Sequence, residues 1–271
     1  MSGGGMRCAY GAGALTALAE EFGLVKPAIV IAASGSAGNA AYYVAGQYTN
    51  GAQIWTSLAN SRFISFRRLP ILDIDYLVDE VFRKNHPFDT GAMEKSKIHF
   101  LVPLTRVNDG ATVYMEPKPA EAIYDYLRAA KAVPVAYGKT VTIQGEEYMD
   151  GDFGASTNDF VLKALEEGAE DLIVLESNPG ESAEKTKYIL MEALWAKGYL
   201  KKEPGVMAAA LHELRPTPPI VLPEGVRLVT VQPTKKISLK PVTTSSMNLR
   251  TAFNLGYDDA TNNAELQKLL Q

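Results

Sequence analysis

The feature that most constrains this chain is an apolar run that leads directly into a glycine-rich turn. Residues 28–33 read Ala-Ile-Val-Ile-Ala-Ala, with turn signals on both sides. An apolar run of this length is typical of a strand buried on both faces, as in a parallel sheet. It enters the turn Ser34-Gly35-Ser36-Ala37-Gly38-Asn39, which is followed by the apolar segment 40–45. The resulting unit of strand, tight turn and helix predicts an α/β fold.

The remaining pattern extends this alternation along the chain. Helical spacing is predicted at 12–22, 74–82, 158–167 and 188–200, and strands at 98–104, 112–115, 140–143, 172–175 and 227–231. Because neither an internal repeat nor a low-complexity linker interrupts this order, we expect one domain over residues 1–271.

The first residues, Met1-Ser2-Gly3-Gly4-Gly5, form a glycine-rich turn with no strand in front of it. In open α/β sheets such a turn normally follows a buried strand. We therefore expect either that a strand before Gly3 is missing or that another element fills its slot.

Composition excludes several classes of function. Three histidines and one cysteine are too few for a Cys/His zinc site or a disulfide framework. The 27 basic and 31 acidic side chains form no long run, so a nucleic acid is not an expected partner. No apolar segment approaches the ~20 residues of a membrane span, and no secretory signal is present. We expect a cytoplasmic protein that is soluble or peripheral to a membrane.

Ser36 is the first candidate for chemistry. A serine in a sharp turn between a buried strand and a helix holds an exposed hydroxyl near the positive end of the helix dipole. The general pattern is G-x-S-x-G, and here Ser34 replaces the first glycine while Gly38 keeps the second. A glycine-rich turn without catalytic use remains the alternative.

Two further windows carry polar chemistry. The run Gly3-Gly4-Gly5 lets backbone N–H groups converge on a negative oxygen, as an oxyanion hole or a phosphate site requires. The dinucleotide-binding pattern G-x-G-x-x-G fails in this loop, because Cys8 stands where the third glycine is needed. The P-loop pattern that Gly138-Lys139-Thr140 would end also fails, because Val133 stands where its upstream glycine is needed. Asp150, just before Gly151, ends a strand-like stretch and could act as a base, or it could belong to an ordinary Asp-Gly turn.

In this order, the three windows resemble those of the patatin-like phospholipase family: a G-G-G-x-R loop, a G-x-S-x-G elbow and a distant D-G-G or D-G-A motif. The continuation Tyr10-Gly11-Ala12-Gly13-Ala14-Leu15 is similar as well. The resemblance implies a three-layer α/β/α fold with a mostly parallel central sheet. It also implies hydrolysis of lipid or small acyl esters without a metal or an organic cofactor.

Carried over residue by residue, the resemblance makes Ser36 the nucleophile and Asp150 the base of a Ser-Asp dyad. It implies an oxyanion hole formed by the amides of Gly3, Gly4, Gly5 and Ala37, with Arg7, Gly38 and Gly151 as supporting motif residues. The sequence departs from the family pattern at Ser34, at Cys8 and at Asp152, which replaces a small residue. A second carboxylate facing the same cavity would raise the pKa of one of the pair, but we expect Asp152 to lie in solvent.

Two rival functions stay open. An α/β-hydrolase triad would use Ser36, Asp150 and His212 in that order, although His212 falls in a helical pattern. A protein of the same fold with an impaired site would bind lipid without cleaving it. We interpret the other histidines, His86 beside a proline and His99 in an apolar strand, as a turn residue and a packed core residue.

The segment from Arg62 to Leu69 interleaves aromatic and basic residues. It could rest on an anionic membrane surface, or its apolar residues could pack inward while the arginines stay solvated. We expect the second arrangement. Neither the lipid or ester cleaved nor the oligomeric state follows from the spacing of residues.

Overall fold

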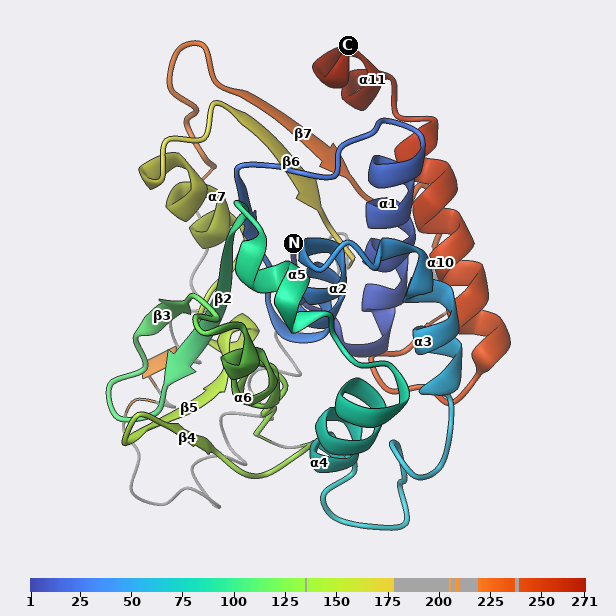
Figure 1. Cartoon of the computed structure of the whole chain (residues 1–271), viewed down its shortest axis with the longest axis vertical. Coiled ribbons are helices and arrows are strands. Elements are labelled where there is room, and N and C mark those ends of the chain that lie inside the picture. Colours follow the sequence, from blue (N-terminus) through green and yellow to red (C-terminus); the bar gives the residue numbers. More distant parts are fainter. Residues whose placement is uncertain (135, 178–204, 206–207, 210–218, 237–238) are drawn as a thin grey trace.

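The computed structural model describes residues 1–134, 136–177, 205, 208–209, 219–236 and 239–271 (Figure 1). The strands are β1 Ile29–Ile31, β2 His99–Arg106, β3 Thr112–Met115, β4 Val141–Ile143, β5 Glu146–Asp150, β6 Asp171–Leu175 and β7 Arg227–Val231. All the predicted strands that fall on described residues are present, with ends shifted by no more than a few residues. The helix predicted at 188–200 lies outside the described residues.

The strands form a five-stranded sheet of parallel and antiparallel pairs and a separate two-stranded sheet. Strand β1 pairs with β2 in parallel, and β6 pairs with β7 in parallel. Strand β2 also pairs antiparallel with β3 and β5, and β4 completes that side through β5. The α/β class is confirmed. The antiparallel strands form the part of the sheet that carries Asp150.

The first two residues join the parallel pairs. The amino group of Met1 donates to the carbonyl oxygen of Ile31 at 2.8 Å, and the Ser2 amide donates to that of Leu175 at 3.2 Å. A cavity of about 500 Å³ lies between β1 and β6. Residues 1 and 2 thus lie at the end of the slot between these strands and place the glycine loop beside the start of α2.

Helices cover both faces of the sheet. On one face, Ile31 and Leu101 pack with Phe160 and Val161 of α7. On the other face, Val102 belongs to a larger cluster with α2, α3, α6 and η3. The helices are η1 Gly5–Cys8, α1 Ala9–Glu20, α2 Ser34–Val44, η2 Tyr48–Asn50, α3 Gly51–Ser57, α4 Ile74–Tyr76, η3 Leu77–Asn85, α5 Thr90–Lys95, η4 Ala120–Ala122, α6 Ile123–Ala129, η5 Gly151–Phe153, α7 Thr157–Glu166, α10 Ser246–Thr261 and α11 Ala264–Leu270.

Helices α1, α3 and α10 run alongside one another on one side of the molecule (Figure 1). Two glycines let α1 and α10 approach closely. A Cβ at Gly13 would lie 1.9 Å from the carbonyl oxygen of Phe253, and one at Gly256 would lie 2.0 Å from that of Tyr10. Because α1 follows the glycine loop directly, this close packing helps to hold the loop in place.

Candidate active site

The turn after β1 is strained at its first residue rather than at Ser36. Ser34 has φ 50°, a backbone conformation that favours glycine, which explains why G-x-S-x-G begins with one. Gly35 cannot carry a side chain, because its Cβ would lie 2.7 Å from the Gly5 carbonyl oxygen. Ser36 lies in the first turn of α2. The glycine loop and the turn are therefore in direct contact.

The predicted exposure of the Ser36 hydroxyl is wrong, because the side chain is fully buried. Its Oγ donates to the carbonyl oxygen of Ser2 at 2.6 Å. Burial raises the pKa of the Cys8 thiol to about 12, although Ser36 opposes this rise, so the thiol stays neutral. Ser2 contacts the hydroxyl and contributes to its burial. The residues next to Ser36 in the sequence do not predict this contact.

Asp150 is buried at the end of β5, with an exposed fraction of 3%. Its carboxylate accepts the Asp152 amide at 3.0 Å, and its carbonyl oxygen accepts the Thr105 hydroxyl at 2.9 Å. Burial, and then the charge of Asp152, raise the pKa of Asp150 to about 7. The Ser34 side chain and the charge of Lys131 oppose this rise. A carboxylate with this pKa exchanges a proton near neutral pH.

The expectation that Asp152 lies in solvent is wrong. Strand β5 ends at Asp150, and Asp152 belongs to the short helix η5, which turns its carboxylate toward the glycine loop. Its Oδ1 accepts the Gly3 amide at 3.2 Å. Asp152 therefore contacts one of the four amides expected in the oxyanion hole and acts on the charge of Asp150.

The other oxyanion candidates divide into two kinds. The Ala37 amide donates to the Ala33 carbonyl oxygen at 3.2 Å, as a helical amide does. Gly4 and Gly5 have φ 140° and 60°, so both positions favour glycine. Over the described ranges of the chain, the amides of Gly4 and Gly5 have no hydrogen-bond partner. These two amides are the donors that this arrangement leaves open.

The supporting motif residues make close contacts around the site. The Arg7 guanidinium donates to the Leu239 carbonyl oxygen at 2.8 Å and ties η1 to the segment before α10. Gly151 lies where a Cβ would be 2.1 Å from the carbonyl oxygen of Pro103. Gly38 faces the Phe82 ring, with its Cβ position 3.4 Å from the ring edge. The three residues hold the loop, the carboxylate segment and α2 in contact.

Lys131 is a residue of this region that the sequence interpretation missed. Its side chain is buried, and its Nζ donates to the Ser34 carbonyl oxygen at 3.0 Å. Burial lowers the pKa of Lys131 to about 8, although Asp150 and Cys8 favour its charged form. A lone lysine between Ala130 and Ala132 was the available signal, since an unpaired lysine is rarely buried.

An apolar cavity opens beside the turn. Gly35 and Gly38 form part of its wall, and most of the remaining wall is apolar or aromatic, including Tyr42, Trp55 and Phe82. The volume is about 80 Å³. Such a wall suits a hydrocarbon chain.

The histidines lie apart from these groups where they are described. His86 follows the last residue of η3, and its carbonyl oxygen accepts the Tyr42 hydroxyl, which fits the predicted turn. His99 is not a core residue, because it lies at the start of β2 with Nδ1 3.5 Å from a carboxylate oxygen of Glu167. His212 lies outside the described residues.

The described segments contain no group of three His, Cys, Asp or Glu side chains that could hold a metal ion. Nor do they contain a helix of the length and apolar character that crossing a membrane requires.

A serine after a buried strand, a glycine-rich loop against it and a buried carboxylate are typical of α/β serine hydrolases. The family model for patatin-like phospholipase matches residues 1–158, which is more than half of the 271 residues. The chain belongs to the patatin-like phospholipase family, and this membership supports lipid acyl hydrolysis in general. A search among curated proteins finds no match.

Proposed function

We propose that this protein hydrolyses acyl esters of lipids through Ser36 and Asp150. The observation that carries the proposal is a series of hydrogen bonds between the two candidates. The Ser36 hydroxyl donates to the Ser2 carbonyl oxygen at 2.6 Å, the adjacent Gly3 amide donates to the Asp152 carboxylate at 3.2 Å, and the Asp152 amide donates to the Asp150 carboxylate at 3.0 Å. These contacts support a shared site for a nucleophile and a base that are far apart in the sequence.

The reaction begins when the Ser36 hydroxyl turns from the Ser2 carbonyl oxygen and gives its proton to Asp150. Its oxygen attacks the ester carbonyl carbon, and the open amides of Gly4 and Gly5 stabilise the resulting oxyanion. When the tetrahedral intermediate collapses, the C–O bond to the alcohol breaks and Asp150 returns the proton to the leaving oxygen. The acyl group remains on Ser36.

Water completes the cycle. Asp150 takes a proton from a water molecule, the hydroxide attacks the acyl-enzyme, and Ser36 leaves with the proton that Asp150 held. The fatty acid is released. Asp150 must be ionised at the start of each half-reaction, so a pKa near neutral suits its repeated exchange of a proton.

The apolar cavity beside Gly35 and Gly38 supports a lipid acyl chain as the group transferred. The contact between the Gly3 amide and Asp152 favours the rival function, a lipid-binding protein with an impaired site, because it occupies one expected donor. The alternative triad with His212 has no support from the described residues.

Labelling with a fluorophosphonate probe tests the proposal. Wild type should be labelled on one residue, which mass spectrometry of the peptides identifies, and Ser36→Ala and Asp150→Asn should lose the label. Ser177→Ala is the matched control, because Ser177 is another buried serine and lies close to Gly4. Circular dichroism establishes that each variant is folded.

A folded wild type that takes no label would mean that the site is impaired. Loss of labelling in a folded His212→Ala variant would replace the dyad with a triad. A panel of phospholipid, lysophospholipid, acylglycerol and short esters, compared between wild type and Ser36→Ala, then identifies the substrate class.

A further inference from the structure

The loop between α3 and α4 presents apolar side chains to solvent on a tip that we call the 65–71 loop, after its residue numbers. Phe66 is 73% exposed and Leu69 is 76% exposed, among the most exposed large hydrophobic side chains of the described residues. At the base, Phe63 and Ile64 are buried, and Ile64 forms a bridge with Leu72. The expectation that apolar residues of this segment pack inward therefore holds for the base and fails for the tip.

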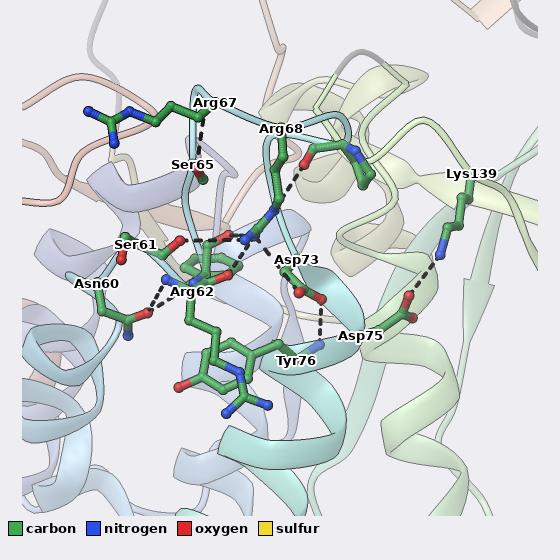
Figure 2. A network of polar contacts seen from close by, with 12 residues as sticks. Asn60, Ser61, Arg62, Ser65, Arg67, Arg68, Asp73, Asp75, Tyr76 and Lys139 are labelled. Carbon is green, nitrogen blue, oxygen red and sulfur yellow. Dashed lines mark hydrogen bonds and ion pairs between the residues drawn. The ribbon is translucent and has the colours of Figure 1, made fainter.

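Arg68 fixes the shape of this loop from the inside. Its guanidinium donates to the carbonyl oxygens of Phe63 at 2.9 Å and Pro70 at 3.3 Å, and it lies 3.8 Å from the carboxylate of Asp73 (Figure 2). The Ser65 amide closes the base by donating to the Ile71 carbonyl oxygen at 3.0 Å. Internal bonds of the loop thus hold Phe66 and Leu69 outward.

The tip also carries a positive charge. Figure 2 shows the Arg67 side chain pointing away from the network that surrounds Arg68. Within the described part of the chain, no acidic side chain pairs with Arg67. Arg62 at the base stacks its guanidinium 4.2 Å from the ring centre of Tyr76. The loop is basic on a protein whose net charge is −4.

The loop continues into the wall of the apolar cavity. Phe63 and Leu72, at its base, line the same cavity as Gly35 and Gly38 of the turn. A surface that receives the tip therefore lies close to the cavity beside the turn that carries Ser36.

We propose that the 65–71 loop docks the protein on an anionic lipid surface, with Phe66 and Leu69 among the acyl chains and Arg67 at the headgroups. Large apolar side chains beside a cationic one are the composition that binds such an interface. This inference deepens the proposed function and rests on it, because the proposed function makes the lipid at this surface the substrate. A second copy of the chain fits the loop less well, because two-fold pairing would set Arg67 near its own equivalent.

Vesicle flotation measures the docking directly. One set of vesicles is phosphatidylcholine and the other holds equal parts of phosphatidylcholine and phosphatidylserine. Wild type should bind both and prefer the anionic set. The double variant Phe66→Ser, Leu69→Ser should bind about a hundredfold more weakly, at roughly tenfold for each large apolar side chain. Arg67→Ala should lose about fivefold on the anionic vesicles and little on the neutral ones.

Val221→Ser is the matched control, because Val221 is 88% exposed. The segment leading into β7, which carries it, lies at the opposite end of the molecule from the loop (Figure 1). Arg68 is left intact, since removing it would change the loop itself. The control should bind both vesicles as wild type does.

The proposal is overturned if wild type binds neither vesicle, or if the double variant binds as well as Val221→Ser. It is also overturned if sedimentation shows a wild-type dimer that the double variant abolishes, since the tip would then receive a second copy. Fluorophosphonate labelling without vesicles should be equal in wild type and the double variant. Vesicle binding without labelling would refute the proposed hydrolysis and leave the docking inference standing.

Discussion

Replacing Asp152 with asparagine should move the acid limb of the activity profile to lower pH. Asp152 and burial together raise the pKa of Asp150 to about 7, and burial is the larger cause. The asparagine side chain keeps an oxygen that can accept the Gly3 amide, so this change removes the charge and spares the hydrogen bond. The variant therefore separates the electrostatic effect of Asp152 from its contact with the loop.

The magnitude follows from the position of the two carboxylates. Two carboxylates at a separation of about 6 Å repel each other by about 3 kcal/mol at an effective dielectric constant of about 20. Asp152 is half-buried, and solvent screening reduces this repulsion to about 1.4 kcal/mol, or about one pKa unit. Because Asp150 stays buried, its pKa should remain above the ordinary value.

A profile of kcat/KM against pH with a short-chain nitrophenyl ester measures this shift, since it reports the free enzyme. A fall of about one unit from a pKa of about 7 raises the ionised fraction of Asp150 at pH 6 about fivefold. Glu147→Gln, an exposed carboxylate on the same strand, should leave the limb in place. A limb unmoved in Asp152→Asn, or moved to higher pH, would refute the coupling between the two carboxylates.

Three further outcomes are expected. Lys131→Met should raise the pKa of Asp150 by about one unit and move the acid limb upward, because a cation that favours the carboxylate is lost; an unshifted profile would contradict this. Asp150→Asn should raise the free energy of unfolding by about 2–4 kcal/mol at pH 8. The buried acid has its pKa raised by folding, so its stabilising effect is present at low pH and lost as pH rises through about 7; urea unfolding at pH 4 should show little difference. Gly256→Ala should lower stability by about 3 kcal/mol in thermal unfolding, because its Cβ would overlap the Tyr10 carbonyl oxygen, whereas Gly91→Ala should be neutral. Equal melting temperatures for these two glycine variants would argue against the close packing of α1 and α10.

Local pattern was sufficient for the elements that frame the site. The apolar run at 28–33 and the small residues after it predict β1, the turn and α2, because burial on both faces and tight backbone contact limit which residues fit. The α/β class was predicted correctly from this pattern, and the family was predicted correctly from the glycine loop, the serine turn and the Asp150 motif taken together. Helix α10 was not predicted, although its packing against α1 depends on Gly256.

The direction of individual side chains was decided by tertiary packing. Asp152 was expected in solvent, but the short helix after β5 turns it toward Gly3, which lies far away in the sequence. Ser36 was expected to expose its hydroxyl, but the backbone of Ser2 covers it. Lys131 is close to Asp150 only because α6 and β5 pack together.

The sequence by itself therefore determined the order of the strands, the need for glycine at the loop and the candidates for nucleophile and base. These properties depend on neighbours along the chain, whose spacing is fixed by covalent geometry. Only the tertiary structure decided which amides stay open, how the pKa of Asp150 is shifted, and that Phe66 and Leu69 face outward around Arg68. Those properties depend on burial and on charges brought close by folding, and spacing along a chain does not record either.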